Sequence, residues 1–192
     1  MRVILPIAAA LALCAGPTLA GVDEGRVALQ HGNYEQAARE LSGAAENGDP
    51  DAATLLGIMY VEGFGVPRDS AKGIALLEKA AEQEDLDATV FLAKLFEGRG
   101  DVAADPSAAA KWYERAARQG EVGAQLSIAD CYLFGRGVAI DYREAYKWYR
   151  VAAAYWGDLV ASAAETAASH LDKDEIAAAE AGALTLLADM SR

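Results

Sequence analysis

The segment KWYERAARQG, at residues 111–120, returns thirty-six residues later as KWYRVAAAYWGD, at residues 147–158. Lysine, tryptophan and tyrosine in one segment could form a stacking site for a nucleic acid or a sugar. A repeated spacing instead favours a repeated structural unit, because repeat proteins are self-similar at a fixed period. The rest of the chain shows which interpretation applies.

The same interval of 36 residues relates much of the sequence. When the chain is aligned with itself at this shift, residues of matching size and polarity coincide. They are Ala52, Ala88 and Ala124; Leu56, Leu92 and Ile128; Gly57, Ala93 and Ala129; Tyr60, Phe96 and Tyr132; Asp69, Asp105 and Asp141; and Leu76, Trp112 and Trp148. The tryptophans are therefore predicted to be core residues of successive units, and the small residues to allow close helix contact.

Each unit has the pattern of two helices joined by a loop. Apolar residues recur at spacings of three and four in the first helix, which should end near Gly63, Gly98 or Gly135. The second helix should begin after the repeated aspartate, whose carboxylate can accept hydrogen bonds from the first turn. The middle loop, EGRGDVAAD, begins one residue early, so its first helix should be shorter. Asp141 with Glu144, and Asp172 with Glu175, have capping-box spacing.

These units predict an all-α chain with one repeat domain at residues 21–192 behind a signal peptide at residues 1–20. The domain is expected to contain a shorter helix pair, three full repeats and two capping helices, at 22–48, at 49–84, 85–120 and 121–156, and at 157–192. Terminal units should depart from the pattern, because one of their faces meets water.

The pattern A-x-x-x-L-G-x-x-Y, then G-x-G-V, D and W-Y-x-x-A-A, resembles the Sel-one-like repeat, a relative of the tetratricopeptide repeat. It stands here as AATLLGIMYVEGFGVPRD (52–69) and AQLSIADCYLFGRGVAIDYREAYKWYRVAA (124–153). GNYEQAARE, near the N-terminus, looks more like the tetratricopeptide turn itself. The resemblance implies a right-handed α-α superhelix, or solenoid, whose first helices line a concave face. It also implies a scaffold or adaptor for proteins or peptides, in bacteria often in the envelope.

The first twenty residues, MRVILPIAAALALCAGPTLA, have the features of a secretory signal. Arg2 precedes a short apolar run, and Thr18-Leu19-Ala20 resembles the small-x-small cleavage site. Cleavage after Ala20 predicts an exported, periplasmic protein without a membrane span. A retained anchor and a lipid on Cys14 are the alternatives, although Leu13 stands where lipoprotein signals have Gly or Ala.

The net charge of −12 argues against nonspecific nucleic-acid binding, which needs lysine and arginine for phosphate contacts. We expect a protein or peptide partner instead. The sequence does not predict an oligomeric state. Cys131, the lone cysteine after cleavage, aligns with Met59 and Leu95 and is predicted to be a core residue.

No local signature of an enzyme is present. The sequence lacks S-x-x-K, G-x-S-x-G and phosphate-loop motifs, and His31 and His170 lie near opposite ends of the chain. We therefore expect no metal, no cofactor and no enzymatic activity. The Arg-Gly loops at 99–100 and 136–137 are expected to be turns, with anion binding as the alternative.

Two alternative functions stay open. One is an envelope enzyme of the lactamase-like or hydrolase type. A cysteine-rich branch of the family is linked to β-lactam binding or hydrolysis, but the paired cysteines of its repeats are missing here. The other is a glycan-binding envelope protein with exposed aromatic residues, for which Tyr155 and Trp156 fall outside the repeated positions.

We expect a partner to bind the concave face of the first helices. Leu56, Gly57 and Tyr60 should face the second helix, so the groove side is predicted to carry a different row of residues. With the shift of 36, this concave strip consists of Thr54, Ile58, Val90, Lys94, Leu126, Asp130 and Leu133. A mixed apolar and charged strip suits an extended or helical peptide. Alternatively, Lys94 and Asp130 only pair with each other between units.

Overall fold

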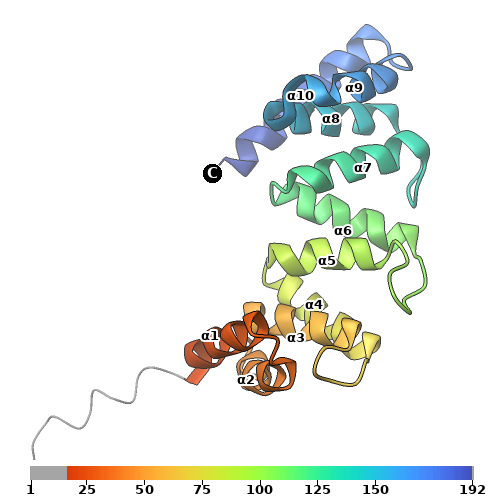
Figure 1. Ribbon diagram of the computed structural model, residues 1–192. Helices are drawn as coiled ribbons and strands as arrows, with labels where there is room; N and C mark the ends of the chain where they lie inside the picture. Colours follow the sequence, from red (N-terminus) through yellow and green to blue (C-terminus); the bar gives the residue numbers. More distant parts are fainter. Residues whose placement is uncertain (1–16, 192) are drawn as a thin grey trace, which may run out of the picture. The chain divides into compact units, whose positions relative to one another are not determined.

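Figure 1 shows the computed structural model, which describes residues 17–191 and places ten α-helices among them. Within that range every regular element is helical, so the expected all-α, solenoid-like helical-repeat architecture is confirmed. Arg2 and Cys14, on which the signal and lipid predictions rest, lie outside the described residues. The chain forms two compact units, which divide between Ala80 and Ala81.

The first unit is built from helices α1 to α4. They are α1 (Pro17–Gln30), α2 (Tyr34–Glu46), α3 (Pro50–Glu62) and α4 (Ser70–Glu82), whose last two residues belong to the second unit. α1 packs on α2, and α2 on α3. The expected turn between α1 and α2 is present at Gly32 and Asn33. α1 begins before Ala20, so this helix is longer than the one predicted from residue 22.

The helices α3 and α4 approach closely because each contributes a glycine. A Cβ atom added to Gly57 would lie 3.0 Å from the carbonyl oxygen of Gly73, and one added to Gly73 would lie 2.7 Å from that of Gly57. Leu77 fills the space beside Gly57 and is fully buried. Ala93 and Ala129, at the equivalent positions, are also fully buried, as the repeat predicts.

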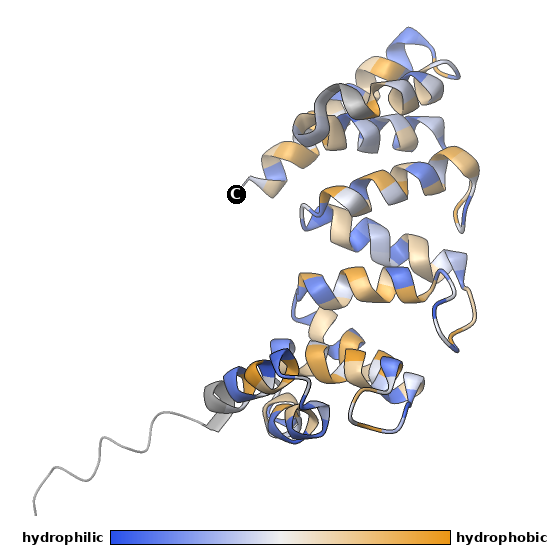
Figure 2. Cartoon of the chain, in the orientation of Figure 1, coloured by the Kyte–Doolittle hydropathy of each residue, from blue (hydrophilic) through white to orange (hydrophobic). Residues whose placement is uncertain are grey.

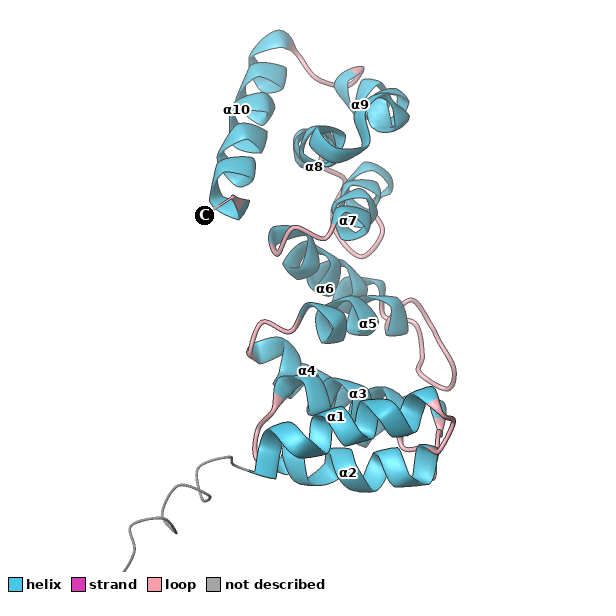
Figure 3. Ribbon diagram, turned by 60° about the vertical axis from the view of Figure 1, so that its left-hand side comes forward, coloured by secondary structure: helices cyan, strands magenta, loops and turns pink. Residues whose placement is uncertain are grey.

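The second unit contains the remaining helices. They are α5 (Leu86–Leu95), α6 (Pro106–Arg118), α7 (Val122–Phe134), α8 (Tyr142–Trp156), the short 3₁₀ turn η2 (Gly157–Val160), α9 (Ala161–Ala168) and α10 (Lys173–Met190). Consecutive helices from α5 to α9 pack on one another, and α10 packs back on α8. Figure 3 shows this order of helices in a second view.

The ends of the helices follow the predicted signals, with one larger departure. The carboxylates of Asp105 and Asp141 accept hydrogen bonds from the first turns of α6 and α8, at 3.0 to 3.1 Å. α3 and α7 both end at a left-handed glycine, Gly63 or Gly135. α5 ends earlier, at Leu95, and has 10 residues where α3 and α7 have 13. The middle helix is therefore shortened by more than the one residue that its loop suggests.

One of the two predicted capping boxes forms in full. Asp172 and Glu175 exchange hydrogen bonds at the start of α10, at 2.9 and 3.0 Å. At the start of α8, Asp141 accepts from the N–H of Glu144, but the carboxylate of Glu144 instead pairs with Lys147 at 2.6 Å. A nearby ammonium ion thus replaces the backbone N–H as the partner of that carboxylate.

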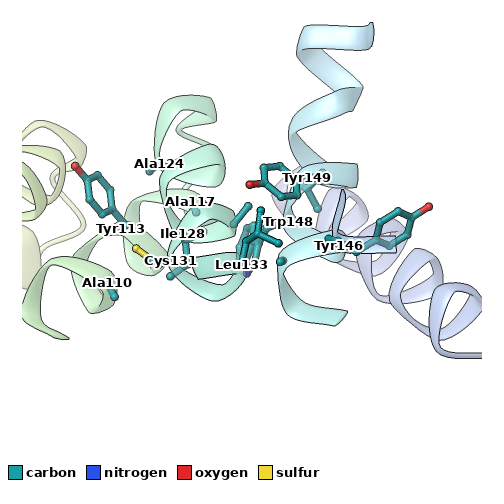
Figure 4. Packing of buried hydrophobic residues seen from close by; sticks show 14 of the residues in the cluster. Ala110, Tyr113, Ala117, Ala124, Ile128, Cys131, Leu133, Tyr146, Trp148 and Tyr149 are labelled. Carbon is teal, nitrogen blue, oxygen red and sulfur yellow. The ribbon is translucent and has the colours of Figure 1, made fainter. Parts of the chain in front are cut away.

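The core of the second unit runs through α6, α7 and α8 (Figure 4). Trp148 is completely buried, and Cys131 is buried as predicted. Trp112, at the equivalent position of the previous repeat, is only half-buried, and the guanidinium of Arg115 lies 5.7 Å from its ring centre. Hydrophobic and hydrophilic residues alternate along the helices, as expected where one face packs and the other meets water (Figure 2).

Among the helices of residues 17–191, none is both long and apolar enough to cross a membrane.

Candidate functional site

The members of the predicted concave strip differ in exposure. Thr54 and Leu133 are buried, at 4% and 7% exposure, so neither offers open surface. Lys94 is exposed, and the half-buried members are Ile58, Val90, Leu126 and Asp130. Thr54 and Ile58 belong to the first unit, and the other five belong to the second.

Asp130 is the most highly connected member of the strip. Its Oδ1 accepts a hydrogen bond from the hydroxyl of Tyr149 at 2.5 Å, and its Oδ2 lies 3.0 Å from Nη2 of Arg136. Both carboxylate oxygens thus bind residues of their own repeat, rather than Lys94 of the preceding repeat. The hydrogen bond to Tyr149 joins the end of α7 to α8, and the ion pair with Arg136 joins it to the loop that follows α7.

A pocket of about 520 Å³ opens beside Asp130. It lies where the α5–α6 loop and α6 meet the end of α7, and the α7–α8 loop closes one side. We name it the loop-end pocket, and its lining comprises Glu97, Ala104, Pro106, Ala109, Tyr113, Ser127, Asp130, Cys131, Gly135, Arg136 and Gly137. The wall is apolar, while two carboxylates and one guanidinium supply the charge.

Two buried tyrosines lie beside these carboxylates, and the hydroxyl of Tyr149 donates a hydrogen bond to Asp130. Burial, and then the neighbouring carboxylate of Glu97, raise the pKa of Tyr113 far above its usual value. Burial and the hydrogen bond to Asp130 do the same to the pKa of Tyr149. Both phenols therefore remain protonated at any physiological pH, and Tyr149 as a donor holds Asp130 in place.

The thiol in the pocket wall is not activated. Burial raises the pKa of Cys131, and the opposing effect of Arg136 is smaller. A nucleophilic cysteine needs the opposite shift, because the thiolate is the reactive form. Cys131 is thus placed as a wall residue, in agreement with its repeat position.

Neither histidine is part of the lining of the loop-end pocket. His170 stacks on Tyr142, with ring centres 4.0 Å apart, and His31 lies in the other unit. Within residues 17–191, no three side chains of the His, Cys, Asp or Glu type are grouped so that they could hold a metal ion.

The sequence predicts Asp130 as a site residue but gives no prediction for its pocket neighbours Glu97, Tyr113 and Ser127. It predicts Arg136 as part of a turn, with anion binding as the alternative, and Arg136 does bind an anion, the carboxylate of Asp130. One signal was available for the tyrosines. The position of Leu77 in the first full repeat is occupied by Tyr113 and then Tyr149, and a hydroxyl in a core position requires a nearby acceptor.

Comparison with known proteins identifies the repeat. The model of the Sel1 repeat matches residues 50–85, 86–121 and 122–154, which together make up more than half of the chain. The chain belongs to the Sel1 repeat family. Sel1 repeat proteins generally mediate protein–protein interactions, and their fold is generally a non-enzymatic scaffold.

Two solved Sel1-type structures are similar to this chain. A Sel1 repeat protein from Oxalobacter formigenes is 31% identical, with a TM-score of 0.56, over 66% of this chain and 96% of that one. A protective antigen of uropathogenic Escherichia coli with an SLR fold is 21% identical, with a TM-score of 0.46, over 90% of this chain and 46% of that one. No curated protein matches the sequence significantly.

Proposed function

We propose that this Sel1 repeat chain is an exported, non-enzymatic scaffold of a bacterial envelope that holds a protein or peptide partner. The observation that carries the proposal is the position of the loop-end pocket. Asp130 belongs both to the pocket and to the concave strip, so a peptide lying along the open members of the strip in the second unit, Val90, Lys94 and Leu126, can place one side chain in the pocket.

The chemistry of the pocket favours a basic side chain, arginine or lysine. Glu97 and Asp130 supply two carboxylates, and the ring of Tyr113 forms part of the wall. Arg136, whose side chain is 57% exposed, already shows that Asp130 accepts a guanidinium. A basic side chain of a partner can take over this role at little cost, because exposed ion pairs contribute only about 0 to 1 kcal/mol.

The net charge of the second unit also favours a basic partner. Residues 81–192 carry 19 acidic and 11 basic side chains, a net charge of −8. A surface with this excess attracts basic partners and raises the rate of their association, an effect that salt weakens.

We expect the purified chain to select basic peptides from an array in which one position is Arg, Lys, Glu or norleucine. The affinity of the selected peptides should fall by up to about fivefold in Glu97→Gln, which corresponds to the upper limit of about 1 kcal/mol for one exposed ion pair. Glu165→Gln, on the exposed side of α9, is the matched control and should bind like the parent. Fluorescence anisotropy at two salt concentrations measures both effects.

Selection of norleucine or glutamate peptides, or equal affinities of the two variants for a basic peptide, would contradict the proposal that the pocket binds a basic side chain.

The second candidate function, glycan binding, rests on Tyr155 and Trp156, which are 61% and 47% exposed. Glycan binding would become the preferred function if the array selected no peptide, and if the chain bound peptidoglycan fragments but its Trp156→Ala variant did not.

Export is a separate expectation. Cleavage after Ala20 should give a mature chain that begins at Gly21, because Thr18-Leu19-Ala20 has the small-x-small pattern of a cleavage site. Mass spectrometry of the protein from a periplasmic fraction measures this end directly. A chain that still begins at Met1, or one with a lipid on Cys14, would contradict the prediction.

A further inference from the structure

The last turn of α7 leaves a large apolar side chain in contact with water. Phe134, the final residue of the helix, is 61% exposed. The sequence predicts Leu133 as the end of the concave strip, but Leu133 is buried. Its neighbour Phe134 is therefore the residue that continues this helix end to the surface.

Phe134 lies on the same face of α7 as the loop-end pocket. Ser127, Asp130 and Cys131 line the pocket, and Phe134 follows them at intervals of seven, four and three residues. Residues at these intervals share one face of a helix. Since an α-helix rises 1.5 Å per residue, Asp130 and Phe134 are about 6 Å apart along the axis of α7.

One side chain already joins the pocket to this aromatic ring. Nη2 of Arg136 lies 3.0 Å from Oδ2 of Asp130, and the centre of its guanidinium lies 5.5 Å from the centre of the Phe134 ring. A single guanidinium can lie this close to both groups only because the carboxylate and the ring are neighbours. A partner residue that binds Asp130 therefore places the next part of the partner near Phe134.

A second apolar side chain is exposed at the same end of α7. Ile140 is 55% exposed, and its Cγ1 lies 3.0 Å from the place that a Cβ atom of Gly135 would occupy. Gly135 is the residue that ends α7, and Phe134 directly precedes it. We name Phe134 and Ile140 together the apolar shelf.

The apolar shelf is particular to the last repeat. Two repeat intervals earlier, Glu62 and Arg68 stand at the places of Phe134 and Ile140. There, Nη2 of Arg68 donates to the backbone carbonyl of Glu62 at 3.2 Å, so polar residues flank the glycine that ends α3. The fold therefore does not require large apolar residues at these positions, and exposed apolar residues beside a pocket are typical of a binding surface.

We propose that the apolar shelf binds the second residue of a two-residue motif in the partner, an inference that rests on the proposed function. The motif consists of Arg or Lys in the loop-end pocket and a large apolar residue, such as phenylalanine, two positions away. In an extended peptide, side chains two residues apart lie on the same side, about 7 Å from each other. This spacing fits the interval of about 6 Å between Asp130 and Phe134.

The charges around the apolar shelf favour such a peptide over a second copy of the chain. The second unit has a net charge of −8, so two copies of it repel each other, whereas a basic peptide is attracted. The carboxylates of the pocket bind any basic peptide, and they do not distinguish one from another. The apolar shelf supplies the selection that charge alone does not.

The test uses labelled peptides with one arginine in a glycine–serine background. Phenylalanine stands one or two residues before or after the arginine, and a peptide without phenylalanine is the reference. At least one peptide with phenylalanine two residues from arginine should bind the parent chain about fivefold more tightly than the reference does, because part of the phenylalanine ring is buried. Phenylalanine one residue from arginine should give no gain, because it points to the opposite side. Fluorescence anisotropy measures each affinity.

Phe134→Ser should erase the gain from phenylalanine and leave the affinity for the reference peptide unchanged. Phe134→Leu should keep most of the gain, because leucine preserves the apolar surface, and Ile140→Ser should reduce it. Tyr155→Ser is the matched control, because Tyr155 is an aromatic residue with the same 61% exposure and is not part of the pocket lining. This variant should bind every peptide like the parent. Circular dichroism verifies that each variant keeps its helix content.

The outcomes separate this proposal from the proposed function. If the reference peptide binds but phenylalanine adds nothing, or if the gain persists in Phe134→Ser, the apolar shelf is not used and the basic-side-chain pocket stands. If no arginine peptide binds, both proposals are wrong. A parent chain that is a dimer in size-exclusion chromatography, with a monomeric Phe134→Ser variant, also overturns the proposal, since the occupant would then be a second copy.

Discussion

Replacing Trp148 by alanine should lower the free energy of unfolding by about 3 to 5 kcal/mol, the range observed when a large aromatic residue is removed from a core. Trp148 is completely buried in the hydrophobic core of the second unit. The neighbouring helices cannot close a cavity of this size, because each is fixed by its contacts with the next repeat. Urea unfolding followed by circular dichroism measures the loss.

Two control variants separate size from polarity and from position. Trp148→Phe keeps most of the ring and removes Nε1, a buried donor without a partner among the described residues, so it should cost less than about 1.5 kcal/mol. Trp112→Ala should cost clearly less than Trp148→Ala, because Trp112 is half-buried. Equal losses for the two alanine variants would show that repeat position, rather than burial, determines the energy.

The difference between the two tryptophans shows how far the repeat can be read from sequence. The interval of 36 residues predicts that both side chains lie on the same face of equivalent helices. It does not predict what covers that face. Trp148 is enclosed, with Arg118 of the preceding repeat 5.9 Å from its ring centre, whereas Trp112 lies beside Arg115 in an open hollow near the start of α6.

Less of the candidate site than of the fold can be predicted from the sequence, because part of the site lies on loops. Helix periodicity is regular, so it predicts Asp130 as a member of the strip. Glu97 and Arg136 lie just beyond the ends of α5 and α7, and their directions depend on how the following loops fold. The early end of α5 at Leu95 is an example, since the sequence suggested a smaller change. Loops vary where helices repeat, and this pocket is built at the loops.

Replacing Gly137 by alanine should destabilise the second unit by about 2 to 5 kcal/mol, from two causes. Gly137 has a φ of +75°, a conformation that costs an L-residue about 1 to 2 kcal/mol. Its added Cβ would also lie 1.9 Å from the carbonyl oxygen of Pro106, a backbone atom at the start of α6. The loop must then move away from α6, and such overpacking costs about 1 to 3 kcal/mol more.

Gly100→Ala is the matched control, because it changes the same residue type in the same conformation. Gly100 has a φ of +68°, but a Cβ added there would meet nothing within 4 Å. It should therefore show only the conformational cost, about 1 to 2 kcal/mol. Urea unfolding of both variants measures the difference between their free energies of unfolding.

The loop that contains Gly137 closes one side of the pocket, so the affinity for a basic peptide reports on the same change. Gly137→Ala should weaken binding of a basic peptide, whereas Gly100→Ala should leave it unchanged. Equal unfolding energies would mean that the loop moves off Pro106 without cost, and the pocket wall would then be too soft to hold Glu97 and Asp130 in a fixed arrangement.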